Sequence, residues 1–178
     1  MNPRVEAVRG DITEQSLDAI VNAANSGLLG GGGVDGAIHA AAGPILDEDC
    51  RRLRASTYPD GLPTGEAVAT RGGDLPARSV VHTVGPRHWE HADGGADLLA
   101  ACHVASLTVA DELGAATIAF PAISCGVYGW SARDAAPIAV GAVRDYLREH
   151  PESGITLVRF VLFDERALSA FEEACSGQ

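Results

Sequence analysis

The sequence predicts an α/β sandwich built around a largely parallel or mixed central sheet. Short β-branched runs alternate along the chain with segments whose apolar residues recur at helical spacing. The length of 178 residues matches one globular domain, so we expect residues 1–178 to form a single domain. A hydrophobic fraction of 46% and a charged fraction of 21% are typical of a folded chain rather than a disordered one.

Six segments rich in β-branched residues predict strands. In chain order they are residues 5–8, 19–21, 67–70, 80–83, 117–120 and 156–163. Ligands of such sheets bind outside the carboxyl ends of the strands. The segments that follow the strands are therefore the candidates for chemistry.

Helical patterns fill the intervals between these strands. A helix is expected over residues 34–53 with an interruption near Gly43-Pro44, and a short one over residues 166–174. Another follows the capping residues Ser131 and Asp134 and carries Pro137 near its start, where proline can kink it. The clearest helix ends at Gly114 and has apolar residues at spacings of three and four: Leu98, Cys102, Ala105, Val109 and Leu113.

All 13 basic residues of the chain are arginine, and lysine is absent. A lysine nucleophile, a lysine Schiff base and a P-loop lysine are thereby excluded. A GC-rich coding sequence would produce the same bias without any functional meaning. The net charge of -11 argues against a protein that binds nucleic acid through many contacts to its phosphate groups.

The N-terminal residues, the short apolar runs and the cysteine spacing together predict a cytoplasmic chain with reduced thiols. Residues 1–13 lack the apolar core of a signal peptide, and the longest apolar run, residues 115–123, is too short to span a membrane. Neither the scattered histidines nor the widely spaced cysteines predict a metal site, and no cofactor is expected. No long exposed apolar pattern demands a dimer, so we expect a monomer. The four cysteines are Cys50, Cys102, Cys125 and Cys175.

A run of four glycines, residues 30–33, lies between a predicted strand and a predicted helix. Without side chains, its backbone N–H groups can approach a ligand closely, and the helix start adds free N–H groups and the positive end of its dipole. This arrangement binds an anion without cationic side chains, which suits an acidic chain that lacks lysine. The alternative is a flexible loop in which glycines are merely tolerated.

Two further segments follow predicted strands. Residues 124–129 (SCGVYG) form a second glycine-rich turn before a helix, and two such nests suggest a diphosphate rather than a single phosphate. In the segment Gly10-Asp11-Ile12-Thr13, Asp11 can accept a hydrogen bond from an amino group or simply cap a turn.

Taken together, these segments resemble the macrodomain family, which binds ADP-ribose. The resemblance runs from about residue 5 to residue 171 and includes residues 10–13, 19–25, 63–67, 81–86 and 121–129. Residues 30–39 (GGGGVDGAIH) are similar to the signature of the MacroD-type hydrolases. The resemblance implies a three-layer α/β/α sandwich with a six-stranded mixed sheet and a cleft at its top. Cys125 departs from the family pattern, in which threonine is more usual.

The resemblance also implies roles for individual residues. Asp11 would accept the adenine amino group, Ile12 would line the adenine pocket, and Phe163 would pack on the adenine ring. Asn25 would bind the distal ribose hydroxyls, with Asp35 facing that ribose and an attacking water. Backbone N–H groups would wrap the diphosphate from Ser124, Gly126, Val127 and Tyr128. The other expected ligand contacts are Ala23, Gly32, Gly33, Val34 and Cys125.

The implied reaction is hydrolysis at the anomeric carbon of the distal ribose, which releases mono-ADP-ribose from a modified carboxylate side chain. Asn25 would fix the ribose, and Asp35 would orient or deprotonate the water, with the ligand's own phosphate as a possible proton acceptor. Asp35 has a plainer alternative as a helix-dipole carboxylate. For His39 a structural role competes with an active-site one, and for Cys125 a small loop residue competes with a nucleophile.

Three other functions remain open at this point. The chain could be a non-catalytic reader of ADP-ribose, since the phosphate loops do not distinguish binding from turnover. It could also act on O-acetyl-ADP-ribose, or on ADP-ribosylated nucleic acid as a modified substrate. The missing lysine and the missing pair of glutamates beside the glycine run exclude two related kinds of macrodomain hydrolase.

Overall fold

The computed structural model describes residues 2–177, which form one six-stranded mixed sheet between two layers of helices. The strand order across the sheet is β1-β6-β5-β2-β4-β3. The strands are β1 (Arg4–Arg9), β2 (Ala19–Ala24), β3 (Ala67–Arg71), β4 (Ser79–Val84), β5 (Thr117–Phe120) and β6 (Leu157–Leu162). All six predicted strands are confirmed; their ends differ from the predicted ones by at most one residue, except that β2 continues three residues further, to Ala24.

Only the edge strand β3 runs against the others. Strands β1, β6, β5, β2 and β4 pair in parallel, whereas β3 pairs antiparallel with β4. Seven residues, 72–78, join β3 to β4, too few for the crossover that a parallel pair would need. The carboxyl ends of the five parallel strands therefore meet at one edge of the sheet.

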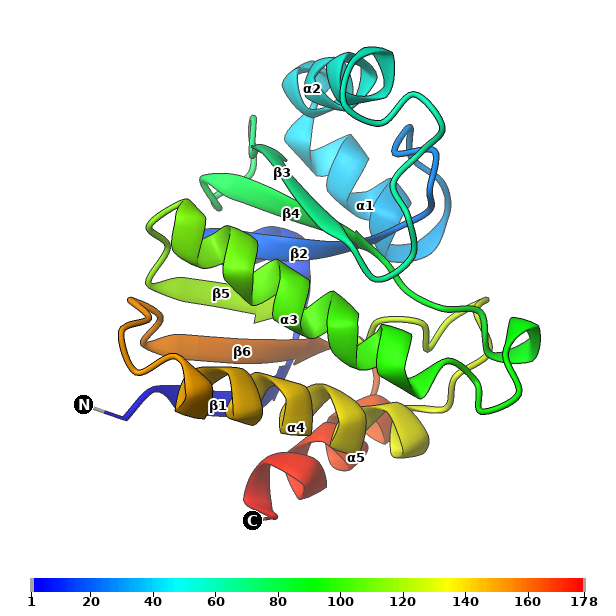
Figure 1. Cartoon of the computed structure of the whole chain (residues 1–178). Helices are drawn as coiled ribbons and strands as arrows, with labels where there is room; N and C mark the ends of the chain where they lie inside the picture. Colours follow the sequence, from blue (N-terminus) through cyan, green and yellow to red (C-terminus); the bar gives the residue numbers. More distant parts are fainter. Residues whose placement is uncertain (1, 178) are drawn as a thin grey trace.

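Helices cover both faces of this sheet (Figure 1). Helices α3 (Ala96–Glu112), α4 (Ala132–Glu149) and α5 (Glu165–Ser176) pack on one face, and α1 (Gly33–Ala42) and α2 (Pro44–Ala55) on the other. Two short 3₁₀ turns, η1 (Ile12–Glu14) and η2 (His88–Glu90), were not predicted. The expected three-layer α/β/α sandwich with a six-stranded mixed sheet is confirmed.

Alternate residues of the central strands supply the two hydrophobic cores. Ala19 and Val21 of β2 belong to the core under α3, α4 and α5, while Ile20 belongs to the core under α1 and α2. Side chains of a strand point alternately to the two faces, and a sheet covered on both faces is apolar throughout. No helix within residues 2–177 has the length and hydropathy of a membrane span.

The two breaks expected in helices have different outcomes. Gly43, with φ of 77°, separates α1 from α2, and Pro44 then occupies the first turn of α2, where its missing N–H is not needed. Helix α4, in contrast, continues through Pro137 to Glu149. The interruption near residue 43 is confirmed, and Pro137 does not end its helix.

Asp49 ties α2 to β3 and gives a test of the fold. Both of its carboxylate oxygens accept hydrogen bonds from the Arg71 guanidinium, at 3.0 and 2.8 Å, and Oδ2 also accepts the Arg71 N–H. These hydrogen bonds hold the pKa of Asp49 below its usual value. The Asp49→Asn variant should lose about 1–3 kcal/mol of unfolding free energy at pH 7.

That loss should depend on pH, because only the ionised carboxylate makes the bidentate pair. The stabilisation is present above the unfolded-state pKa of about 3.9 and disappears as the pH falls through the lower folded-state pKa. Urea denaturation of both proteins at pH 7 and pH 3 measures this difference. The matched control is Glu48→Gln on the same helix, whose exposed pair with Arg52 should contribute little. An equal loss at both pH values would contradict the assignment.

Candidate active site

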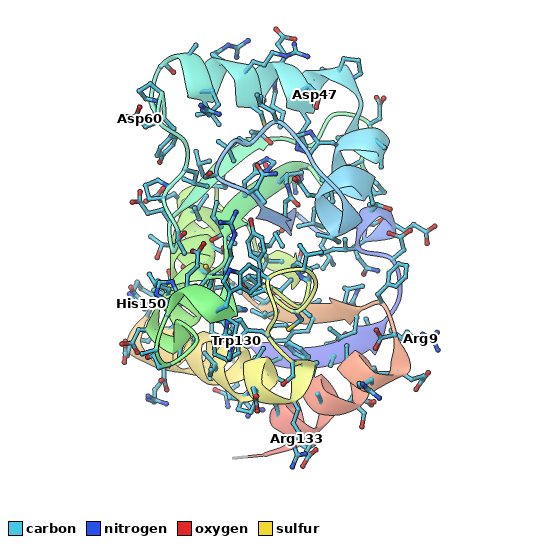
Figure 2. The ribbon with its side chains drawn as sticks, turned by 90° about the vertical axis from the view of Figure 1, so that its right-hand side faces the viewer. Arg9, Asp47, Asp60, Trp130, Arg133 and His150 are labelled. Atoms are coloured by element: carbon cyan, nitrogen blue, oxygen red, sulfur yellow. The ribbon has the colours of Figure 1, made fainter. Side chains whose placement is uncertain are left out.

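The loops that follow β2 and β5 lie at the edge where the parallel strands end (Figure 2). In residues 2–177, only two non-glycine residues adopt positive φ, and each lies in one of these loops: Leu28 at 60° and Ser124 at 67°. A left-handed conformation costs an ordinary residue about 1–2 kcal/mol, and such strain gathers at functional sites. The backbone therefore marks the same two loops that the sequence indicates.

The first loop, residues 25–32, ends in the uncapped start of α1. Gly32 is the N-cap of this helix and makes no side-chain capping bond. Across the described chain, the N–H groups of Gly31, Gly32, Gly33, Val34 and Asp35 donate to no other group. A Cβ atom on Gly32 or Gly33 would meet nothing within 4 Å, so this N–H cluster opens onto free space. It is suited to bind an anion.

Tight contacts shape the first loop from within. A Cβ on Gly36 would lie 2.4 Å from the Gly31 carbonyl oxygen, so the loop can fold back on α1 only because residue 36 is glycine. Asn25 completes the turn, since its Oδ1 accepts the Gly27 N–H at 3.0 Å and its Nδ2 donates to the Gly30 carbonyl at 3.0 Å. One Asn25 N–H hydrogen remains for a ligand.

The second loop, residues 124–129, presents another set of free donors. The N–H groups of Ser124, Gly126, Val127 and Tyr128 make no hydrogen bond to any described residue. These are the four donors that the family resemblance assigns to the diphosphate. Ser124 Oγ is buried without a hydrogen-bond partner among residues 2–177. Buried polar atoms without a partner are rare, and a bound water or ion is one of the explanations for such an atom.

Cys125 interrupts this series of donors. Its N–H donates to the Ala122 carbonyl at 3.2 Å, and its thiol lies 3.6 Å from the Ile123 carbonyl. Burial raises the pKa of the Cys125 thiol to about 12, so the thiolate needed for nucleophilic attack is absent near neutral pH. These contacts support the small-loop-residue interpretation and leave neither the N–H nor the thiol of Cys125 free to donate to a ligand.

Asn25 and Asp35, ten residues apart in the sequence, lie beside the same glycine. A Cβ on Gly31 would lie 3.1 Å from Asn25 Nδ2 and 3.2 Å from Asp35 Oδ2. The two predicted catalytic side chains thus approach the same point beside Gly31, one with an amide donor and the other with a carboxylate oxygen. Asp35 is only 5% exposed, so its carboxylate is largely shielded from solvent.

Behind Asp35 lies a buried polar cluster that the sequence analysis largely missed. Asn22 Nδ2 donates to Asp35 Oδ1 at 2.8 Å and approaches His82 Nδ1 at 3.1 Å, and His39 Nε2 lies 3.3 Å from Asp35 Oδ1. Asn22 and His82 are completely buried in β2 and β4. A detectable signal was the occurrence of asparagine and histidine within otherwise apolar strands, since buried polar side chains require partners.

His39, Cys50 and His82 offer metal-ligand atoms within 4.8 Å of one another, a cluster that their sequence spacing does not reveal. The hydrogen bonds compete with metal binding. Since Asn22 Nδ2 can only donate, His82 Nδ1 accepts, and His82 Nε2 then carries the proton directed at Thr70 Oγ1, 2.9 Å away. In that tautomer His82 has no lone pair left for a metal.

The residues assigned to adenine lie together at the ends of β1 and β6. Arg9 pairs with Leu162, so Asp11 and Phe163 follow neighbouring strand ends. Asp11 Oδ1 accepts hydrogen bonds from Thr13 N and Thr13 Oγ1, and in the described chain its other carboxylate oxygen has no partner. Asp11 therefore caps the turn and keeps one acceptor free. The Phe163 side chain is 86% exposed.

The remaining predicted contacts occupy varied positions. Ile12 is buried in the core under α1 and α2. Ala23 and Val34 are half-buried beside the first loop, whereas Val127 is 88% exposed at the tip of the second. The Arg87 guanidinium lies over the Tyr128 ring, 5.2 Å from its centre. The ligand roles of all these residues stay predictions.

A separate hollow of about 330 Å³ lies where β1 begins, away from both loops. It is lined by Asn2, Pro3, Val5, Arg144, Leu147 and Arg148. It contains neither a carboxylate nor a row of free N–H groups, so its volume alone does not make it the candidate site.

Fold and loops together define a class of protein: an α/β sandwich that presents two clusters of free backbone N–H groups beside a buried carboxylate. The sequence model of the Macro domain matches residues 21–139. The chain belongs to the macrodomain family.

Individual relatives agree with this assignment. A Macro domain-containing protein of Streptomyces coelicolor is 59% identical over 167 residues, covering 94% of this chain and 95% of that protein. An O-acetyl-ADP-ribose deacetylase of Escherichia fergusonii is 50% identical over 169 residues, covering 93% and 91%. The Trypanosoma brucei macrodomain in complex with ADP-ribose superimposes with a TM-score of 0.85 at 42% identity, covering 97% of this chain and 69% of that one.

Proposed function

We propose that this protein binds ADP-ribose and hydrolyses mono-ADP-ribose from carboxylate side chains of modified proteins. The observation that carries the proposal is the placement of Asn25 Nδ2 and Asp35 Oδ2 next to the same face of Gly31, beside the free N–H groups of the glycine loop. A phosphate-binding loop needs no carboxylate, whereas water attack at a sugar carbon needs a proton acceptor. The buried Asp35 supplies one.

The proposed reaction is a single displacement by water. The water oxygen forms a bond to the anomeric carbon of the distal ribose as the bond from that carbon to the acceptor carboxylate breaks. The departing carboxylate takes the bond's electron pair, and the water proton passes to Asp35 Oδ2. Asn25 holds a ribose hydroxyl with its remaining N–H, which keeps the anomeric carbon in line with the water.

The rest of the ligand follows the free donors and the exposed ring. The diphosphate accepts hydrogen bonds from the N–H groups of the second loop, which compensates for the absence of lysine in this chain. The adenine amino group donates to the free oxygen of Asp11, and the ring stacks on Phe163. The trypanosomal relative in complex with ADP-ribose supports this choice of ligand.

Phe163→Ala should weaken ADP-ribose binding by about 10- to 100-fold, because stacking of a base on an aromatic ring contributes about 1–3 kcal/mol. The melting temperature should stay within about 1 °C of wild type, since the ring is exposed and packs on no core. Calorimetric titration with ADP-ribose measures the first effect. Leu113→Ala removes an exposed apolar side chain at the C-terminal end of α3, outside both loops, and serves as the control. Unchanged affinity in Phe163→Ala would place the adenine elsewhere.

O-acetyl-ADP-ribose is a second candidate substrate. The E. fergusonii relative named as a deacetylase of this compound matches almost the whole chain at 50% identity. Both substrates are carboxylic esters of the distal ribose, so the same loops can hold either one.

One experiment separates hydrolysis from mere binding. The protein is incubated with a carboxylate-linked mono-ADP-ribosylated protein, with O-acetyl-ADP-ribose and with 5′-phosphate-linked ADP-ribosylated DNA, and free ADP-ribose and acetate are measured. Release from the modified protein is the expected result. Tight calorimetric binding of ADP-ribose with no release from any substrate would identify a reader module instead. Release from O-acetyl-ADP-ribose or DNA alone would reassign the substrate.

A further inference from the structure

The Arg54 side chain, near the end of α2, holds two separate segments through their backbone carbonyls. Its Nη1 donates to the Gly27 carbonyl oxygen of the first loop at 2.9 Å. Its Nε and Nη2 donate to the Tyr58 and Pro59 carbonyl oxygens, at 3.0 and 3.2 Å, in the α2–β3 turn (residues 58–62). The planar guanidinium presents several N–H donors in a fixed fork, so one side chain can hold both segments at once.

The α2–β3 turn lies directly against the first loop. The Leu62 N–H donates to the Ser26 carbonyl oxygen at 2.9 Å. A Cβ on Gly61 would lie 2.8 Å from that same oxygen, and Gly61 has φ of 100°, so this close approach requires glycine. Asp60 marks the turn in Figure 2, beside the end of α2. The Ser26 oxygen therefore contacts a turn that Arg54 itself holds.

Two peptide units connect these contacts to Asn25. The Ser26 carbonyl and the Gly27 N–H belong to one planar unit, and this N–H donates to Asn25 Oδ1 at 3.0 Å. The Gly27 carbonyl and the Leu28 N–H belong to the next unit, and this N–H donates to the Asn25 backbone oxygen at 3.2 Å. Arg54 holds the second unit directly and the first through the α2–β3 turn.

The Gly27 N–H decides which way the Asn25 amide faces. If the amide were turned by half a rotation, Nδ2 would meet the Gly27 N–H, donor against donor. In the observed orientation Oδ1 accepts from Gly27, and Nδ2 donates to the Gly30 carbonyl and lies beside Gly31. The hydrogen of Nδ2 that is proposed to hold the ribose is therefore aimed by the peptide units that Arg54 fixes.

We propose that Arg54 is a positioning residue for Asn25. Its guanidinium fixes residues 26–28 relative to α2, and these residues fix the orientation of the Asn25 amide. Leu28 has φ of 60°, and such strain persists only where the surrounding contacts hold it. This inference rests on the proposed function for its kinetic consequence, whereas the effect on the loop itself is independent of catalysis.

Arg54→Ala should lower kcat for a carboxylate-linked ADP-ribosylated protein by about 10- to 100-fold, because a small misplacement of a positioned group is costly. KM and the calorimetric affinity for ADP-ribose should change by less than about threefold, since the free N–H donors at the start of α1 and in the second loop lie outside the held segment. Guanidinium ion far below denaturing concentrations should restore part of the lost kcat, and an equal concentration of sodium chloride should not.

Amide hydrogen exchange of the full-length protein tests the loop without any turnover. In Arg54→Ala the N–H groups of Gly27 and Leu62 should exchange at least about tenfold faster than in wild type, because both depend on contacts that Arg54 maintains. The amides of β2 should keep their wild-type exchange rates, because the sheet does not depend on Arg54.

Matched variants separate the guanidinium fork from charge and from folding. Arg54→Lys retains the charge, but one ammonium group cannot reach carbonyls in both segments, so it should behave like Arg54→Ala. Arg51→Ala removes an exposed arginine from the same helix and should change neither kcat nor exchange.

Wild-type kcat or wild-type Gly27 exchange in Arg54→Ala would overturn the proposal. A lost kcat that guanidinium does not restore, together with a lowered melting temperature, would also overturn it, because Arg54 would then only stabilise the fold. If the wild-type protein releases no ADP-ribose, the proposed function fails, and the exchange rates of Gly27 and Leu62 still decide whether Arg54 holds the loop.

Discussion

Replacing Asp35 with asparagine is expected to lower kcat by about 10²- to 10⁴-fold, the usual contribution of a positioned general base. Asparagine keeps an oxygen that can accept the hydrogen bond from Asn22 Nδ2, so the buried cluster retains its shape. It provides no anionic oxygen beside Gly31 for the water proton. The affinity for ADP-ribose should change by less than about threefold, because the free N–H donors are untouched.

Turnover of a carboxylate-linked ADP-ribosylated protein and calorimetric binding measure these two effects on the same preparation. Asp97→Asn is the control, since Asp97 is the exposed acidic residue in the first turn of α3. If Asp35 only stabilised a helix dipole, both variants would lose similar stability, about 0.3–1 kcal/mol, and neither would lose turnover. A wild-type turnover rate in Asp35→Asn would contradict the catalytic role of Asp35 but not the assignment of the binding site.

The second large effect concerns Gly33→Glu, which should weaken ADP-ribose binding by at least about 100-fold. A Cβ at this position points into open space beside the free N–H groups, so the new side chain fills the space that the ligand needs. Its carboxylate also competes for those N–H groups and repels the diphosphate. Isothermal titration with ADP-ribose measures the loss.

Backbone strain needs its own control at this position, because Gly33 has φ of 60°. Gly33→Ala carries the same strain without the length or the charge and should bind within about tenfold of wild type. Gly126→Glu places the same side chain on the second loop, where a Cβ meets nothing within 4 Å and φ is not positive. It should weaken binding as strongly. Normal affinity in both glutamate variants would show that the ligand lies elsewhere.

The fold was predictable because its signals are local. Alternating strand and helix patterns gave the six strands, and Gly43-Pro44 marked the division between α1 and α2. The short turn η2 (His88–Glu90) lacks such a pattern and was missed. Pro137 shows the limit of a local rule, because packing of α4 against α3 and α5 keeps the helix continuous through it.

The two loops of the candidate site were equally predictable from the sequence, but the roles of their individual groups were only partly predictable. Four of the five residues in 124–128 have free N–H groups, and the turn that ties Cys125 to Ala122 could not be read from residue types. His39 appeared ambiguous between a structural and a catalytic residue. Its two carboxylate neighbours, Asp35 and Asp47, decide that it belongs to the cluster behind Asp35.

The sequence by itself determined the α/β sandwich, the two glycine-rich loops at the strand ends, and the exclusion of lysine chemistry. These features follow from hydrophobic periodicity, local glycine content and overall composition, all of which can be read directly from the sequence. The tertiary structure decided that Asn25 and Asp35 both lie beside Gly31, and that Asn22, His39 and Asp47 lie behind them. Such contacts join α1 and α2 to the sheet. Only packing brings these side chains together, because their spacing along the sequence does not indicate that they are neighbours.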